Sequence, residues 1–171
     1  TYMIDGHMRH EDHMGHVGEL KSGGVQWMSA GRGVIHSEMP QQEQGRMRGF
    51  QLWLNLPANE KMKPAAYRDI PATEIPVVAL PNGGTAKVIA GTLDVDGHST
   101  AGPIQGLTTA PLYLDIELPA GASVTVPTPS GHRAFVYVFE GGVAIGPAAA
   151  SRELDTHHVG ILADGNEVTL T

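Results

Sequence analysis

The chain contains no cysteine, an absence that excludes disulfide bonds and thiolate metal ligands. Any metal must therefore be bound by histidine, carboxylate or water. Basic residues are also scarce: 11 lysines and arginines stand against 18 aspartates and glutamates, which gives a formal net charge of −7. Because an acidic surface repels a phosphate backbone, we expect no direct contact with nucleic acid.

Long apolar runs are absent as well. None approaches the roughly 20 residues that a helix needs to cross a bilayer, so we expect no membrane span. Residues 1–6 predict a strand that enters a turn, and they lack the pattern of a signal peptide. The lack of cysteine suits a reducing compartment, and these features together favour a cytoplasmic protein.

The 22 glycines and 12 prolines gather in short clusters between apolar runs. Period-two alternation, or a β-favouring run buried on both faces, marks four segments as strands: residues 50–56, 112–118, 123–126 and 134–139. Only residues 59–67 hint at a short helix, which Pro64 limits. Short strands separated by glycine and proline turns predict an all-β fold, an antiparallel sandwich or barrel.

Two short blocks recur in the same order, which indicates a duplicated β-unit. Residues 1–6 match 136–141 in kind, and the pattern of residues 17–25 is matched by that of 159–168. The first copy begins in mid-strand without an initiator methionine, and the second ends near the point where the first continues. We therefore expect the chain to be the middle of a longer protein, with strands missing at both ends.

The proline-rich stretch between the copies gives the expected division of the chain. Residues 1–56 would form part of an N-terminal barrel, residues 57–76 a connection, and residues 77–171 part of a C-terminal barrel. Because incomplete barrels leave sheet edges and apolar faces uncovered, we expect the isolated chain to be prone to aggregation.

The clearest chemical signal follows a Gly-Arg-Gly turn at residues 31–33. A strand-like stretch comes next, at 34–39, and residues two apart on a strand project to the same face. His36 and Glu38 therefore lie side by side, as two ligands of a divalent metal such as Fe(II), Mn, Ni or Zn. The His-x-Glu pattern is common, and two ligands are too few for a tight site, so further ligands must come from elsewhere.

Four other histidines occur at every third position: His7, His10, His13 and His16. The repeat places them on a hairpin, where a solvated or hydrogen-bonded surface role is the leading interpretation, with His10 kept as a candidate lining residue. His157 and His158 occupy the corresponding part of the second copy and face opposite ways, so they form a poor chelate. Trp27 and Trp53 fall in apolar runs and are expected to pack in the core.

The chain resembles the pirin family of the cupin superfamily. Residues 24–40 and 51–57 carry the resemblance, and shorter matches support it at residues 67–70, 75–78, 88–91, 111–115 and 135–141. The resemblance implies a bicupin, two β-barrels in tandem, with one metal in the N-terminal barrel and none in the second.

Family members bind this metal with three histidines and one glutamate, and His36 and Glu38 match the last two ligands. The first two precede the strand at residues 1–6 and are absent here, so the resemblance implies half a site and weak or absent metal binding by this chain alone. Fe(II) is the first expectation, with Mn, Ni, Co, Cu and Zn as alternatives.

The resemblance implies one of two functions. Bacterial-type pirins resemble quercetin 2,3-dioxygenases, which open a flavonol ring with O2 at the metal. Glu38 would then be both a ligand and the catalytic base, and the partners would be a small flavonol-like aromatic and O2. The alternative is a non-enzymatic regulator, a transcription cofactor that acts through a protein partner; an acidic surface permits a basic one.

Overall fold

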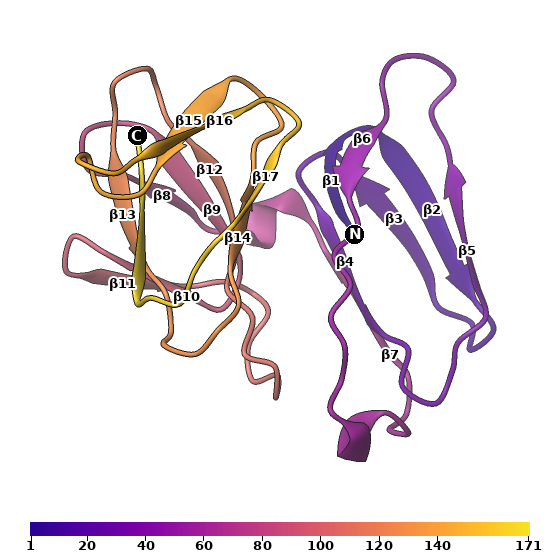
Figure 1. Ribbon diagram of the computed structural model, residues 1–171. Coiled ribbons are helices and arrows are strands. Elements are labelled where there is room, and N and C mark those ends of the chain that lie inside the picture. The colour runs from indigo at the N-terminus through magenta and orange to yellow at the C-terminus, as the bar shows by residue number, and fades with distance from the viewer. The chain divides into compact units, whose positions relative to one another are not determined.

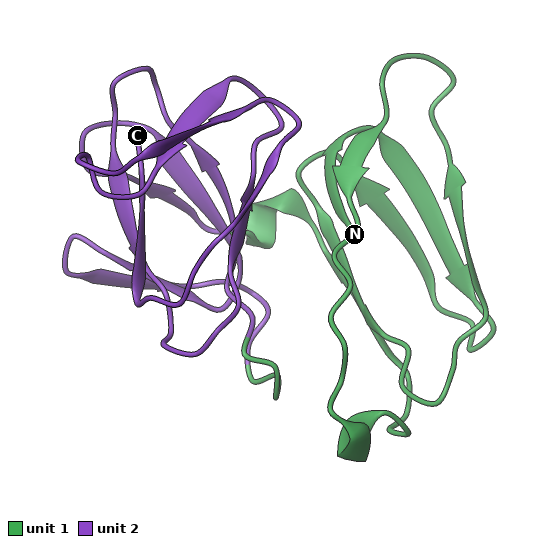
Figure 2. Cartoon of the chain, in the orientation of Figure 1, with its two compact units in different colours: residues 1–75, 106–110 green, residues 76–105, 111–171 purple.

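The computed structural model describes residues 1–171 and contains strands β1 to β18 with two single-turn 3₁₀ helices, η1 and η2 (Figure 1). The strands form antiparallel sheets, so the prediction of an all-β antiparallel fold is confirmed. No helix has the length and apolar character that a membrane span requires. The chain divides into two compact units, residues 1–75 with 106–110 and residues 76–105 with 111–171 (Figure 2).

The first unit contains two sheets, with strand orders β6-β1-β4-β7 and β3-β2-β5. Its strands are β1 (Tyr2–Asp5), β2 (His7–Asp12), β3 (Val17–Lys21), β4 (Val25–Ser29), β5 (His36–Pro40), β6 (Arg48–Phe50) and β7 (Ala66–Ile70). The helical turns flank β7: η1 (Ala58–Glu60) and η2 (Ala72–Glu74). The stretch expected as a connection, residues 57–76, contains β7, which pairs with β4 inside this unit.

The second unit contains four sheets, with strand orders β12-β9-β8, β13-β18-β15-β16, β10-β11 and β14-β17. Its strands are β8 (Val77–Ala79), β9 (Thr85–Ala90), β10 (Thr92–Val95), β11 (His98–Ala101), β12 (Tyr113–Glu117), β13 (Val124–Pro127), β14 (Phe135–Tyr137), β15 (Gly142–Ile145), β16 (Arg152–Asp155), β17 (Val159–Ile161) and β18 (Glu167–Leu170).

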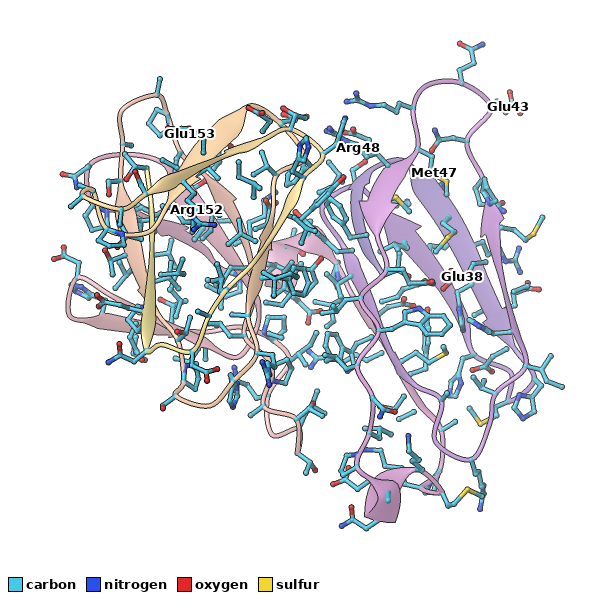
Figure 3. All side chains as sticks on the ribbon, in the orientation of Figure 1. Glu38, Glu43, Met47, Arg48, Arg152 and Glu153 are labelled. Carbon is cyan, nitrogen blue, oxygen red and sulfur yellow. The ribbon has the colours of Figure 1, made fainter.

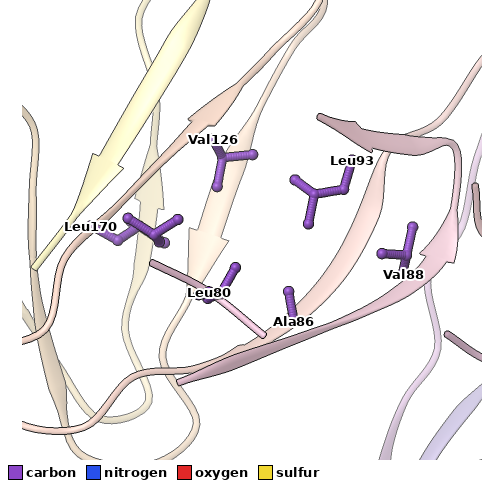
Figure 4. Packing of buried hydrophobic residues seen from close by; sticks show 7 residues of the cluster. Leu80, Ala86, Val88, Leu93, Val126 and Leu170 are labelled. Carbon is purple, nitrogen blue, oxygen red and sulfur yellow. The ribbon is translucent and has the colours of Figure 1, made fainter. Parts of the chain in front are cut away.

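An apolar core fills the interior of the second unit (Figure 4). Its buried members come from several strands and their flanking turns: Leu80, Ala86, Val88, Leu93, Val124, Val126 and Leu170. Burying a valine or leucine side chain contributes about 1.5–3 kcal/mol relative to leaving it exposed, so this cluster is a main source of the unit's stability.

Three of the four runs expected to be strands coincide with β12, β13 and β14, and the other expectations need correction. Residues 51–56 have no regular structure, because no neighbouring strand pairs with them. The predicted helix at 59–67 is reduced to the single turn η1. β14 is not buried on both faces, since Phe135 and Tyr137 are 55% and 39% exposed.

A backbone hydrogen-bond motif marks the register of the internal repeat. In the first unit, the Met3 N–H donates to the Gly24 carbonyl at 3.0 Å, and the Met3 carbonyl accepts from the Gly23 N–H at 2.7 Å. The Gly24 N–H then donates to the Lys21 carbonyl at 2.9 Å. The first two bonds join β1 to the turn between β3 and β4, and the third closes that turn.

The second unit contains the same motif. The Val138 N–H donates to His158 at 3.1 Å, the Val138 carbonyl accepts from His157 at 2.7 Å, and the His158 N–H donates to Asp155 at 3.2 Å. His157 even adopts the left-handed backbone of its counterpart, with φ of 65° against 80° at Gly23. The duplication is therefore visible in the backbone itself.

This register agrees with the match of residues 1–6 to 136–141 and corrects the second match. Because Lys21 corresponds to Asp155, residues 17–25 correspond to 151–159 and not to 159–168. The pattern of residues 17–25 also fits the following strand, because alternating apolar residues recur in many strands of the chain. His157 and His158 therefore match a glycine turn, not the histidine-rich hairpin.

The repeated turn gives a matched pair of substitutions. We expect Gly23→Ala to lower the free energy of unfolding by about 1–2 kcal/mol, because an L side chain is disfavoured at positive φ. A Cβ there would also lie 2.9 Å from the Ala72 Cβ. His157→Gly, at the equivalent position, should not destabilise the chain. Urea unfolding measures the free energy of unfolding of both variants. If the Gly23→Ala chain were as stable as the wild type, the turn would not require a glycine at position 23.

Candidate metal centre

Strand β2 carries one histidine into the interior of the first unit. Its side chains alternate, so that Met8 and His10 are 4% and 1% exposed while Arg9 and Glu11 face solvent. This is the period-two pattern of a strand with one covered face. His10 is thus buried and has no surface role, which agrees with its being kept apart from the other three histidines as a candidate lining residue.

Strand β5 brings the two predicted ligands next to His10. It pairs antiparallel with β2, with Glu38 opposite His10 and His36 opposite Asp12. The ligand atoms of His10, His36 and Glu38 all lie within 4.8 Å of one another. Figure 3 labels Glu38 among the strands of the first unit. The structure therefore places both sequence-predicted residues in one cluster and adds a third, which comes from a different strand.

The His10 ring has no hydrogen bond. Both of its nitrogens are buried without a partner, and the nearest carboxylate oxygen, Oδ2 of Asp12, is 3.9 Å from Nε2, too far for a hydrogen bond. Burial lowers the pKa of His10, and the adjacent His36 lowers it further, against the opposing charge of Glu38. The neutral imidazole is thus favoured, and this is the form that binds a metal.

Glu38 is held by a side chain from the irregular stretch after β6. Nε2 of Gln51 donates to Oε2 of Glu38 at 3.2 Å, while Oε1 of Gln51 accepts from Nε1 of Trp53 at 3.0 Å. The indole of Trp53 is 84% exposed, so the expectation that Trp53 packs in the core is wrong. A segment without regular structure can direct two side chains toward the cluster, because strand alternation does not constrain it.

A polar layer lies behind His10. The Tyr67 ring stacks on the His10 ring at 4.3 Å with an interplanar angle of 16°, and its hydroxyl donates to Oδ1 of Asp69 at 2.5 Å. Nε2 of Gln26 donates to the same hydroxyl at 2.9 Å. Burial raises the pKa of Tyr67, and the hydrogen bond to Asp69 raises it further, so the phenol stays protonated. Residues 67–70 support the family resemblance, but no pattern in the sequence places Tyr67 or Asp69 next to His10.

The other histidines of the hairpin have hydrogen-bond partners, as expected. His7 contacts Glu19 at 2.5 Å on the outer face of the sheet, and Nδ1 of His13 accepts from a backbone N–H at 3.1 Å. Nδ1 of His16 lies 2.7 Å from Oδ2 of Asp12. Burial would raise the pKa of Asp12, but hydrogen bonds from the His16 side chain and from backbone N–H groups lower it to about 2.

The second unit has apolar residues where the first has this cluster. By the register of the repeat, His10 corresponds to Ile145, and β15 pairs with β18 through Ile145 and Leu170 as β2 pairs with β5 through His10 and Glu38. Three apolar residues thus occupy the three equivalent positions: Ile145, Val168 and Leu170. The second unit packs these residues in or against its core, whereas the first keeps polar groups there.

This contrast makes His10→Ile a test of what the buried histidine contributes. A buried polar group without a partner costs about 1–3 kcal/mol, so we expect the substitution to raise the free energy of unfolding of the metal-free chain by about 1 kcal/mol. His7→Ile, on the outer face of the same strand, is the control and should change it by less than about 0.5 kcal/mol. Urea unfolding compares the free energies of unfolding of the two variants and the wild type. A lower value for His10→Ile than for the wild type would show that the buried histidine does not destabilise the chain.

The fold and the cluster together define a class of protein, the cupins with a His/Glu site. The family models agree: residues 1–54 match Pirin, and residues 113–171 match the Pirin C-terminal cupin domain. The chain belongs to the pirin family.

Individual relatives agree with this assignment. A Pseudomonas aeruginosa protein provisionally named a quercetin 2,3-dioxygenase is 45% identical over 170 residues, which cover 99% of this chain and 59% of that protein. Pirin of Mus musculus is 39% identical over 172 residues, 99% of this chain and 57% of the relative. The crystal structure of quercetin 2,3-dioxygenase from Acinetobacter baumannii superposes with a TM-score of 0.87 at 34% identity, over 99% of this chain and 58% of that one. The chain thus spans a little under three fifths of these proteins.

Proposed function

We propose that this chain supplies His36 and Glu38 to a mononuclear metal site, with the buried imidazole of His10 beside them. We further propose that the protein is a dioxygenase that opens the ring of a flavonol-like aromatic with O2. The convergence of three ligand atoms within 4.8 Å, one of them on a buried histidine without a hydrogen bond, carries the proposal. The names of the Pseudomonas and Acinetobacter proteins support the choice of substrate class.

The donor set fits a divalent metal. Imidazole and carboxylate groups are the ligands of non-haem Fe(II) oxygenases, and the same donors accept Mn, Co, Ni, Cu or Zn. The chain has no cysteine that would favour a thiolate site. A metal bound there would orient a substrate hydroxyl and lower its pKa. We therefore take Fe(II) as the first candidate.

The surrounding side chains would then have distinct tasks. Gln51 restrains one oxygen of Glu38, so the other can bind the metal or accept the proton of a substrate hydroxyl. Trp53, fixed by its hydrogen bond to Gln51, offers an exposed aromatic face close to this carboxylate. A planar aromatic substrate can stack on such a face, which suits a flavonol.

A second candidate function is a regulator that binds a protein partner, and an apolar surface on the second unit favours it. Phe135 pairs with Ile161 and Tyr137 with Val159 across β14 and β17. All four side chains are exposed, from 39% at Tyr137 to 78% at Ile161. Exposed apolar side chains gathered on one pair of strands are typical of protein interaction sites.

Metal content tests the site. We expect the wild-type protein to retain Fe(II) or Mn, with less metal in this chain than in a longer form that supplies further ligands. His36→Ala and Glu38→Ala should each abolish retention, because they remove a ligand without disturbing a packed core. His7→Ala, which removes a histidine from the outer face of β2, is the control. Plasma mass spectrometry on purified variants measures the content, and unchanged metal in His36→Ala or Glu38→Ala would refute the assignment.

Turnover separates the two functions. We expect the metal-loaded, full-length protein to consume quercetin and O2, and the Glu38→Gln variant to lose this activity by a factor of about 10² or more, since a proton acceptor contributes that much. Absorbance and an oxygen electrode follow the two substrates. No turnover with Fe, Mn, Ni, Co or Cu would reject the dioxygenase and favour the regulator.

A further inference from the structure

The side chain of Gln51 connects Glu38 to Trp53. Its Nε2 donates to Oε2 of Glu38 at 3.2 Å, and its Oε1 accepts from Nε1 of Trp53 at 3.0 Å. Both ends of one amide are therefore engaged, one by a predicted metal ligand and the other by an indole. Gln51 is itself exposed, so without these partners its amide would bond to water and sample several rotamers.

The two partners allow only one orientation of this amide. An indole N–H can only donate a hydrogen bond, and an ionised carboxylate can only accept one. If the amide turned by 180°, Oε1 of Gln51 would face the carboxylate and its NH2 group would face the indole, so both hydrogen bonds would be lost. Nε2 also lies 3.5 Å from Oγ1 of Thr1, but a hydroxyl can donate or accept and does not decide the orientation. Trp53 therefore helps to keep a donor directed at Glu38.

A paired strand ends immediately before Gln51. β6 pairs antiparallel with β1, with Phe50 opposite Tyr2. Residues 51–56 then continue without regular structure. The pairing of β6 thus fixes the start of this segment, and the hydrogen bond from Trp53 fixes the amide of Gln51 within it.

Glu38 has a flexible side chain that needs an orienting group if it is to bind a metal. It lies on β5, which is the outermost strand of the sheet β3-β2-β5, and its side chain is only half-buried. A carboxylate that binds a metal is usually hydrogen-bonded to a second residue, which orients it. Gln51 is the residue that makes such a bond with Glu38, and it engages one carboxylate oxygen and leaves the other for the metal.

We propose that Gln51 and Trp53 are a coupled pair of positioning residues for Glu38: the indole N–H fixes the Gln51 amide, and Gln51 holds the carboxylate so that its other oxygen is available as a ligand. This inference rests on the proposed metal site. It gives Trp53 an effect on the metal that is separate from stacking against a substrate.

Co2+ titration of the full-length protein, first freed of metal, tests the inference. Gln51→Leu removes the hydrogen bond to Glu38 and should weaken Co2+ binding by about 10- to 100-fold, the usual effect of losing a group that orients a ligand. Trp53→Phe keeps an aromatic ring but loses the N–H, so it should weaken binding by about 2- to 10-fold, the contribution of one neutral hydrogen bond. The visible absorption bands of bound Co2+ should shift in Gln51→Leu, because the orientation of Glu38 changes.

A double variant tests whether Trp53 acts through Gln51. Once Gln51→Leu has removed the amide, adding Trp53→Phe should cause no further loss of Co2+ affinity, because substitutions within one hydrogen-bonded network are not additive. An equal loss from Trp53→Phe in the wild-type and Gln51→Leu backgrounds would overturn the coupling.

Gln41→Leu is the matched control. Gln41 is also exposed, but its amide donates to the backbone carbonyls of Met39 and Pro40, at 3.1 and 3.2 Å, and not to a predicted ligand. This variant should keep the Co2+ affinity and spectrum of the wild type. Far-UV circular dichroism checks that each variant is folded, and Gln51→Ala, with the same expected loss, replaces Gln51→Leu if that variant does not fold.

The results distinguish this inference from the proposed site. Wild-type Co2+ affinity and an unchanged spectrum in Gln51→Leu or Gln51→Ala, with loss of binding in Glu38→Ala, would overturn the positioning role and leave the site intact. Wild-type affinity in Glu38→Ala would overturn both.

Discussion

The pairing of β2 with β5 is the constraint on which the candidate site depends. A shift of one residue along either strand would turn His36 and Glu38 to the opposite face of the sheet from His10. The register is fixed near both ends of the pair: the His13 N–H donates to the Ile35 carbonyl, and the Gln41 N–H donates to the His7 carbonyl, both at 2.9 Å. Backbone hydrogen bonds, more than the ligands themselves, therefore bring the three groups together.

Comparing the two copies of the duplicated unit shows which positions are polar in the first interior and apolar in the second. The two buried polar residues of the chain, His10 and Gln26, both lie in the first unit, and three of their ring and amide atoms have no hydrogen bond. The second unit places Ile145 at the position of His10 and closes its interior with apolar side chains. The two copies of one β-unit have thus diverged: the second has an apolar interior, and the first keeps buried polar groups at the equivalent positions. Buried polar groups without partners lower stability, and such a loss is the usual cost of a functional site, so it is consistent with the proposed one.

The sequence predicted the parts of the site that depend on local geometry. His36 and Glu38 share a face because they are two residues apart on one strand, and this needs no knowledge of the fold. His10 joins them only through the pairing of β2 with β5, and Tyr67 only through β4 and β7, so neither position follows from a local pattern. The all-β fold and the duplication were predictable for the same local reason. The alignment of the second repeat block was not, since one alternating strand resembles the next.

The candidate ligands and the side chains around them come from different parts of the chain. The first family model ends at residue 54, so it covers His10, His36 and Glu38 but not β7, which supplies Tyr67 and Asp69. A ligand set does not by itself decide whether a metal is used for catalysis or for recognition, because function depends on the surrounding geometry as well as on the fold. The groups that fix the orientation of a ligand determine how precisely the metal is held. The distinction between an enzyme and a regulator is therefore to be sought in residues such as Tyr67 and Gln51, which contact the candidate cluster of His10, His36 and Glu38.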